Sequence, residues 1–493
     1  MTSRETVVNG DDGLDFEDEQ AKEQKAAEES QLDKPITVKF LLSFTIPTIL
    51  SFVIMGVFGT IDGVFASRGI SVEALGAVNF VMPFFTFSMA IGAMLAMGGS
   101  ALVAKKKGKK LKQEARENFS LLTLVTFGIS LMISIPSWIF REPLLRLLGT
   151  NEHVFDLALE YLQPLIIMVP FVILGMFLTQ FLIAEGRPVL GMIASVSGAF
   201  VSTALNVLFV IVLEIGVLGL ALATGIGYGL PTVLGVIYFT FNRKGTIYFV
   251  RPKWDAGALV RSSINGISEM ITMAAMTVTT IVMNNVLVRI VGFEGVAAAG
   301  IVMAVQGIFS SLYFGYAAGV APVVSFNFGR ATEYGMDTEN GRERRNNLKK
   351  LYKKSLVLVA VLSLIALVST IIFADLLVRI YVPAGTEMHT MTVRGLRIAA
   401  TGYLFMGFNV FATAWFTALN DGLVSGFMSF MRTMVFTLLL LVTLPRAWDL
   451  NGAWIALPFA ELLSITLTIF FLIKMGGKYY YREPKNGNTF KTL

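Results

Sequence analysis

Cysteine is absent from the chain of 493 residues, and only two histidines occur, His153 and His389. The absence of cysteine excludes disulfide bonds and thiolate metal sites, but it does not indicate a compartment. Neither histidine has a second ligand at metal-binding spacing, and both fall in predicted loops. We therefore expect both histidines at the surface, and we expect no cofactor.

Charged residues are also scarce. They make up 15% of the chain, whereas 55% is hydrophobic and the mean hydropathy is +0.68. This composition excludes a soluble globular protein, because the polar residues are too few to cover the apolar ones. The apolar segments contain no paired-carboxylate motif, histidine cluster, glycine-rich phosphate loop or nucleophile signature. An enzyme is therefore not predicted.

Long apolar segments dominate what is present. A helix of about 20 residues spans the roughly 30 Å hydrocarbon core of a bilayer, and twelve segments are long enough. The sequence thus predicts an all-α integral membrane protein with twelve transmembrane helices. The approximate ranges are 39–66, 73–104, 119–140, 157–184, 188–213, 216–241, 259–290, 294–327, 353–380, 393–420, 422–443 and 452–475.

An internal repeat divides the chain into two halves. A gapless offset of 221 residues places residues 68–108 on residues 289–329, and a basic loop follows each stretch. Internal repeats are typical of secondary transporters, in which the substrate site lies between two halves that move against each other. Identical pairs under this offset include Gly98 with Gly319 and Gly108 with Gly329.

Lysine and arginine cluster in four regions that fall on the same side when the helices are counted. By the positive-inside rule this side is cytoplasmic, together with both termini, in a multi-pass protein of the plasma membrane. The pI near 9.2 follows from this topology, so no nucleic-acid partner is predicted. The four regions are 105–116, 243–261, 330–354 and 478–491.

The first residues differ from the rest in composition. Residues 1–34 carry eleven acidic and four basic side chains, which favours a disordered tail, and they lack the pattern of a secretory signal. The predicted organisation is an acidic cytoplasmic tail, a first six-helix half, a cytoplasmic linker, a second six-helix half and a basic cytoplasmic tail. The respective ranges are 1–35, 36–241, 242–258, 259–475 and 476–493.

Ionisable residues inside the spans are the candidate site, because each is costly in hydrocarbon and usually faces a cavity or a partner. Asp62 lies near the outer end of the first helix, and Glu269 lies about ten residues, or roughly 15 Å, into the seventh helix. Either carboxylate could bind a proton, a sodium ion or a cationic substrate in turn. The alternative is that each carboxylate has a structural role, in which it caps or joins helices. Glu461 and Arg432 are also candidates, but for both a structural role is the favoured interpretation.

Neutral polar residues could complete the site, or they could join helices by hydrogen bonds. The candidates are Asn79, Gln180, Asn206, Asn284 and Asn285. The thirty-nine phenylalanines and twenty-three methionines suit a soft apolar chamber for flat cations.

Short motifs are spread along nearly all of the apolar region. They are Gly59-Thr60-Ile61-Asp62-Gly63, Ala184-Glu185-Gly186-Arg187-Pro188, Leu205-Asn206-Val207, Gly216 to Thr224, Gly266-Ile267-Ser268-Glu269 and Gly319 to Gly329. Together they resemble the multidrug and toxic compound extrusion (MATE) transporters over residues 36–475. The resemblance implies two six-helix bundles related by pseudo-twofold symmetry around a V-shaped cavity. It also implies efflux of organic cations driven by proton or sodium entry.

Two site residues carry over from this resemblance. Asp62 matches the family's first-helix aspartate, and Glu269 matches a glutamate of the seventh helix. Where many relatives place an aspartate four residues after the fifth-helix asparagine, this chain has Val210 after Asn206. The departure weakens the prediction of an ion site shared by the first and fifth helices. It favours an ion site formed by Asp62 with Asn206 alone, or one at Glu269 in the second half.

The prediction is a monomeric, secondary active multidrug exporter. It exchanges small organic cations for protons or sodium ions by alternating access, with any sodium bound at Asp62 or Glu269. A flippase for lipid-linked saccharides, from the same superfamily, is the alternative. A flippase should need cavity arginines for pyrophosphate, and within the spans Arg432 is the candidate. A membrane-embedded enzyme or a channel is the third class of function.

Overall fold

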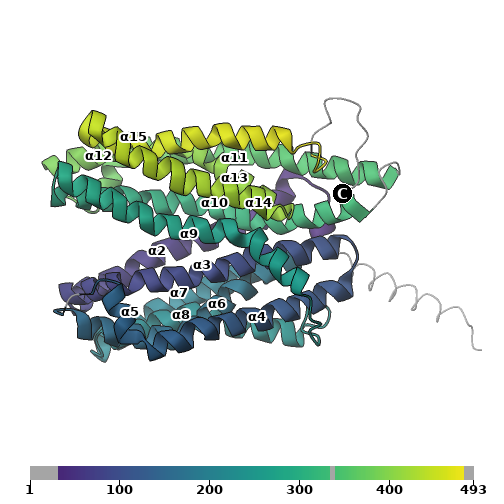
Figure 1. Ribbon diagram of the computed structural model, residues 1–493, viewed down its shortest axis with the longest axis horizontal. Coiled ribbons are helices and arrows are strands. Elements are labelled where there is room, and N and C mark those ends of the chain that lie inside the picture. The colour runs from purple at the N-terminus through teal and green to yellow at the C-terminus, as the bar shows by residue number, and fades with distance from the viewer. Residues whose placement is uncertain (1–30, 151, 334–338, 482–493) are drawn as a thin grey trace, which may run out of the picture.

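The computed structural model describes residues 31–150, 152–333 and 339–481, and every regular element in these ranges is helical. The predicted all-α class is confirmed (Figure 1). In the first half the helices are α2 (Val38–Val64), α3 (Val72–Gly108), α4 (Lys112–Ile139), α5 (Arg141–Leu147), α6 (Phe155–Glu185), α7 (Pro188–Asn206) and α8 (Val217–Phe241). In the second half they are α9 (Ala256–Ile290), α10 (Phe293–Glu333), α11 (Glu339–Arg379), α12 (Glu387–Ala400), α13 (Tyr403–Ala418), α14 (Gly422–Phe430) and α15 (Thr437–Lys474).

The membrane spans agree with the predicted number once two bends are considered. In the described part of the chain, ten helices are long and apolar enough to span, and α12 with α13 forms one further span bent by 48°. The longest span, Gly422–Lys474, has 53 residues and is interrupted by non-helical backbone at Trp448 and Asp449. This break separates the predicted eleventh and twelfth helices, so the chain has the predicted twelve-helix layout.

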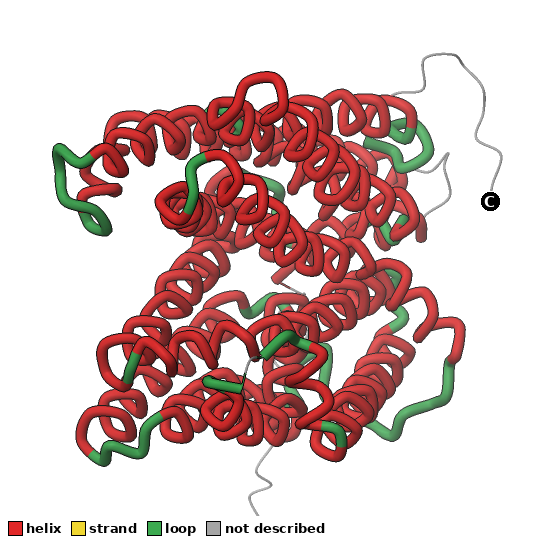
Figure 2. Tube along the Cα trace, turned by 60° about the vertical axis from the view of Figure 1, so that its left-hand side comes forward, coloured by secondary structure: helices red, strands yellow, loops and turns green. Residues whose placement is uncertain are grey.

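Each half forms a bundle of its own, and the two bundles lie against each other (Figures 1 and 2). In the first half α6 packs against α3, α4, α7 and α8, and in the second half α10 packs against α11, α12 and α13. Contacts between the halves come mainly from α3 against α9 and α10, and from α2 against α10. These three pairings position the space between the bundles.

Glycines bring the two halves into backbone contact. A Cβ added at Gly98 would lie 1.9 Å from the carbonyl oxygen of Ser262, and one at Gly266 would lie 1.9 Å from that of Met94. A second contact lies at the basic ends of α3 and α10. There a Cβ at Gly108 would lie 2.1 Å from the carbonyl oxygen of Phe326, and one at Gly329 would lie 2.2 Å from that of Lys105. Glycines of both halves thus form the interface, and one pair of them, Gly108 and Gly329, is related by the 221-residue offset.

A buried ion pair fixes the linker that joins the halves. Lys107 Nζ lies 2.9 Å from Glu185 Oε2, and the two side chains are 1% and 4% exposed. Glu185 also accepts hydrogen bonds from the backbone N–H groups of Thr246 and Ile247. Glu185, at the end of α6, therefore holds the linker after α8. It also neutralises Lys107, which the sequence assigns to a basic loop.

The residues before α2 contact the second half rather than the first. Gln31–Asp33 form a short 3-10 helix, η1, in which Leu32 is fully buried. Asp33 pairs with Arg330 at 2.6 Å and with Arg344 at 3.0 Å. The acidic tail predicted for 1–35 is thus structured from residue 31, because Leu32 and Asp33 both find partners. Residues 1–30, and those after 481, lie outside the described residues.

The surface position expected for His389 is wrong. This side chain is 7% exposed on α12, and its Nε2 lies 3.4 Å from Asp375 Oδ1 on α11. His153 is exposed as expected. The sequence gives no sign of the difference, because the carboxylate that faces His389 comes from the preceding helix.

The close contact at Gly98 gives a test of the interface. We expect Gly98→Ala to lower the thermal unfolding midpoint in detergent, because the added Cβ must displace the backbone of α9. Gly128→Ala on α4 is the matched control, since no atom lies within 4 Å of its added Cβ. This control should be neutral or stabilising by about 1 kcal/mol from helix propensity. Equal midpoints for both variants would contradict the interface.

The Lys107–Glu185 pair gives a second test. Glu185→Gln leaves a buried ammonium without a counter-charge, so the free energy of unfolding should fall by about 3–5 kcal/mol. The control is Glu114→Gln, whose carboxylate pairs with Lys106 at the same 2.9 Å but is 52% exposed. An exposed pair contributes about 0–1 kcal/mol. If thermal unfolding shows that both variants lose the same free energy of unfolding, burial does not determine the contribution of the Lys107–Glu185 pair.

Candidate functional site

Four of the predicted site residues, Asp62, Gln180, Glu269 and Asn284, line one or another of three adjoining cavities. The first surrounds Asp62 inside the first half, the second lies between the halves and contains Glu269, and the third lies inside the second half. The Asp62 pocket and the central cavity share Met55, Gly227 and Tyr228. The central and second-half cavities share Thr272, Met276, Gly307, Ser310 and Phe314.

Asp62 is held by two donors from other helices. Asn206 Nδ2, at the end of α7, donates to Asp62 Oδ1 at 2.7 Å, and Thr224 Oγ1 of α8 donates to Asp62 Oδ2 at 3.3 Å. All three side chains are buried, and Asp62 is 8% exposed. The pocket at Asp62 has a volume of about 10 Å³, which suits a single small ion or water rather than an organic molecule.

Two segments of π-helix shape this site. The first, η2 (Phe65–Ile70), follows α2 just after Asp62, and the second, η3 (Val207–Val212), follows Asn206. Val210 in η3 is buried, and its Cγ1 lies 2.9 Å from a Cβ placed on Gly69 of η2. Val210 therefore packs one π-helix on the other. Thr224 supplies the second polar partner of Asp62. The sequence did not predict this contact, although Thr224 is the last residue of the motif Gly216 to Thr224.

Glu269 lies in the central cavity, at the contact between the halves. The cavity has a volume of about 340 Å³ and is lined from both bundles. Gln180 of α6 lines it too and donates to the carbonyl oxygen of Ala318 on α10 at 3.3 Å, so this predicted residue joins the halves. Methionines and aromatic residues make up much of the wall. They are Phe52, Met55, Met89, Met97, Met176, Tyr228, Met273, Met276 and Phe314.

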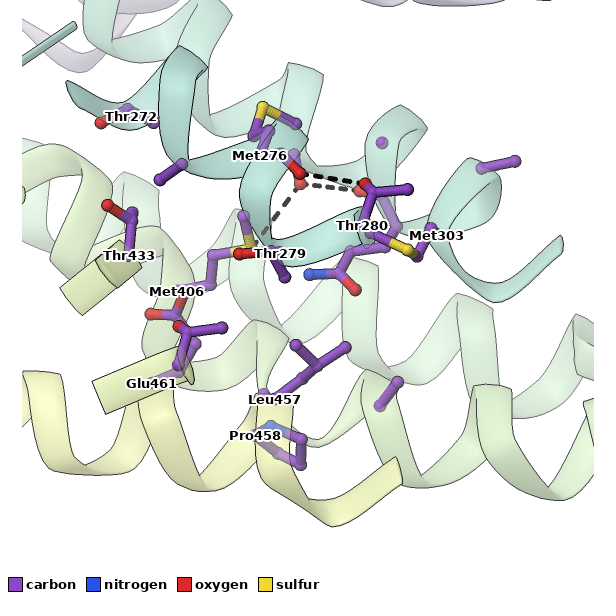
Figure 3. A pocket seen from close by; sticks show the side chains of 18 of the residues that line it. Thr272, Met276, Thr279, Thr280, Met303, Met406, Thr433, Leu457, Pro458 and Glu461 are labelled. Atoms are coloured by element: carbon purple, nitrogen blue, oxygen red, sulfur yellow. Dashed lines mark hydrogen bonds between the residues drawn. The ribbon is translucent and has the colours of Figure 1, made fainter. Parts of the chain in front are cut away.

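The second-half cavity is the largest of the three, at about 530 Å³. Both residues that the sequence analysis interpreted as structural, Glu461 and Arg432, line it. Asn409 Nδ2 donates to Glu461 Oε2 at 2.7 Å, and Thr468 donates to Asn409 Oδ1 at 2.7 Å. In Figure 3, Thr272, Met276, Thr279 and Thr280 of α9 lie across this pocket from Leu457, Pro458 and Glu461 of α15.

The remaining predicted residues are divided between cavity and exterior. Asn284 of α9 lines the second-half cavity. Asn285 is exposed and donates to the carbonyl oxygen of Ile281 on its own helix at 2.9 Å. Asn79 is exposed on α3 and lines none of the three cavities. The structure therefore brings Asp62 together with Asn206, and it places Glu269, Gln180 and Asn284 at larger spaces nearby.

The architecture is that of a membrane protein of two helical bundles, with largely apolar cavities inside and between them that contain a few acidic and polar side chains. The MatE family model matches residues 47–208 and 269–443, which is more than half of the chain. The chain therefore belongs to the MatE family, and the resemblance noted in the sequence is confirmed.

Relatives and solved structures match over most of their lengths. The multidrug export protein MepA of Staphylococcus haemolyticus is 21% identical over 443 residues, which cover 89% of this chain and 94% of MepA. MepA of Staphylococcus saprophyticus is 23% identical over 388 residues, with 76% and 82% covered.

A crystal structure of MATE in complex with MaL6 has a TM-score of 0.84 at 18% identity, over 91% of this chain and 98% of that one. An outward-facing MATE transporter of the MOP superfamily has a TM-score of 0.83 at 18% identity, over 91% and 97%. At this identity the likeness concerns the fold.

The two hydrogen bonds to Asp62 make a third test. The shorter, charge-assisted bond from Asn206 should be the stronger, so the coupling energy between Asp62→Asn and Asn206→Leu should be about 1–3 kcal/mol. The coupling between Asp62→Asn and Thr224→Val should be smaller. Double-mutant cycles of unfolding in detergent measure both. A larger coupling to Thr224 would contradict the geometry.

Proposed function

We propose that this MatE chain is a secondary active multidrug exporter that exchanges organic cations for protons or sodium ions by alternating access. The observation that carries the proposal is the position of two carboxylates: Asp62 in a pocket of ion size and Glu269 in a larger cavity between the halves. The name of the MepA relatives, multidrug export protein, supports the same function.

The Asp62 pocket is suited to the coupling ion. Asn206 Oδ1 is buried without a hydrogen-bond partner next to the carboxylate, so one acceptor beside Asp62 is free. A protonated Asp62 could donate to this oxygen after rotation of the amide, whereas a sodium ion could bind the carboxylate, the amide oxygen and the Thr224 hydroxyl. Hard cations prefer such oxygen ligands.

The central cavity is suited to the substrate. Methionine side chains adapt to different shapes, and aromatic faces attract flat cations. Glu269 adds a negative charge to a wall that is otherwise mostly apolar. A lipophilic cation would thus gain apolar contact and charge neutralisation in the same space.

Alternating access needs two states whose occupancy the ion can shift. The backbone contacts at Gly98, Gly108 and Gly266 join the halves near the ends of α3 and α10 and the start of α9. In these contacts glycine Cα atoms lie against backbone carbonyl groups of the other half. We propose that they open and reform as the halves move. Ion and substrate would then be coupled through their different affinities for the two states.

A lipid-linked saccharide flippase fits the cavities less well. Among the described residues that line the three cavities, Arg432 is the single arginine or lysine. A pyrophosphate carries more than one negative charge, and one guanidinium neutralises it incompletely. Two acidic residues, Glu269 and Glu461, line the same or the adjoining cavity. The exporter is therefore the better-supported function.

Ethidium efflux from cells tests the proposal. The wild-type chain should lower cell-associated ethidium fluorescence when an inward proton or sodium gradient is imposed. Asp62→Asn should reduce the initial efflux rate at least about tenfold, because a neutral amide no longer binds and releases the ion. Glu269→Gln should reduce ethidium affinity, because the cavity loses its negative charge.

Glu160→Gln is the matched control, since Glu160 is an exposed carboxylate on α6. It should leave the efflux rate unchanged, and all variants should be compared at equal amounts in the membrane. Wild-type cells that move no ethidium under either gradient would overturn the exporter proposal. Unchanged efflux in Asp62→Asn would place the coupling ion elsewhere.

A further inference from the structure

The cavity of the second half contains a charge without a partner. Arg432 is 5% exposed, and its Nε and Nη1 are buried without a hydrogen-bond partner. Glu461, which lines the same cavity, is bound by Asn409. A buried guanidinium is costly unless it is paired, because the low-dielectric interior does not replace its hydration. Arg432 is therefore available to a ligand of the cavity.

The backbone supports this placement of Arg432. It lies in a π-helix, η4 (Met431–Phe436), and Thr437 Oγ1 donates to its carbonyl oxygen at 2.8 Å. Single π-helical turns inside α-helices often occur at functional sites. In the first half the corresponding helix has the π-helix η3 directly after Asn206. Both halves thus depart from α-helical geometry at or beside a buried polar side chain.

Acidic groups lie on the other sides of this space. Glu461 lines the cavity from α15, and Glu269 lies in the adjoining central cavity, three residues before the shared Thr272. The two adjoining cavities together therefore offer one positive and two negative groups, separated by neutral threonine, methionine and aromatic surface. Such a wall complements a molecule that carries charges of both signs.

We infer that Arg432 binds the carboxylate of zwitterionic substrates, whose cationic part lies toward Glu269. The guanidinium presents its N–H groups as a planar fork that matches a carboxylate. The cavity of about 530 Å³ has room for a drug-sized molecule. This inference deepens the proposed export function and rests on it for transport, but ligand binding at Arg432 can be measured without transport.

A pair of dyes isolates the carboxylate. Rhodamine 110 has a cationic ring system and a free carboxylate, and rhodamine 123 is its methyl ester with the same rings. Fluorescence polarisation with the full chain, purified in detergent, gives Kd for each dye. We expect the wild type to bind both. Arg432→Gln should weaken binding of the free acid about tenfold or more and leave the ester unchanged or bound more tightly.

Two further variants complete the experiment. Arg432→Lys keeps the charge but loses the planar fork, so its Kd for the free acid should lie between those of the wild type and Arg432→Gln. Arg446→Gln removes the same charge from an exposed site on α15 and should change neither Kd. Size-exclusion profiles check that each variant is folded.

A wild-type measurement covers the case in which the Arg432 variants do not fold. Benzoate should displace the free acid, whereas the neutral benzamide should not. The inference is wrong if the wild type does not bind the free acid, if Arg432→Gln changes both dyes equally, or if benzoate and benzamide act alike. Loss of ethidium efflux with intact dye selectivity would instead overturn the export function and leave the carboxylate site standing.

Discussion

The high cost of a charged group in a low-dielectric interior determines how the buried charged side chains of this protein are paired. Lys107 is buried with Glu185, Asp62 is buried with Asn206 and Thr224, and Glu461 is bound by Asn409. In each case the partner comes from a different helix, so satisfying the charged group by an ion pair or hydrogen bonds also joins the helices. Against this pattern, a buried Arg432 with unpartnered nitrogens stands out, because the same cost has to be met by something that enters the cavity.

The second constraint is the close approach of backbones between the halves. Lipid does not drive one helix against another, so helices in membranes associate through small residues that let the backbones touch. Gly98 and Gly266 provide this contact, as do Gly108 and Gly329. Because the offset of 221 residues relates Gly108 to Gly329, a repeat in the sequence becomes one interface with similar contributions from both halves.

Much of the fold could be predicted from the sequence, because hydropathy and helix length constrain membrane spans strongly. The boundaries of the halves and the break near Trp448 follow from apolar segments separated by polar ones. The pairing of Asp62 with Asn206 could be proposed because both residues belong to family motifs. Thr224, Asn409 and the position of Arg432 could not, because neutral or single polar residues on apolar helices give no sign of the direction in which they point.

The sequence by itself determined that the chain spans a membrane, that it is built from two related halves, and which carboxylates lie within the spans. These properties depend on the free energy of transfer of each residue from water to lipid, and this quantity can be read from the composition and periodicity of the sequence. Only the tertiary structure decided that Val210 packs on Gly69 while Thr224 contacts Asp62, and that Glu461 and Arg432 line one cavity. Such contacts depend on helix rotation and on π-helical turns, and a single added residue per turn redirects every following side chain.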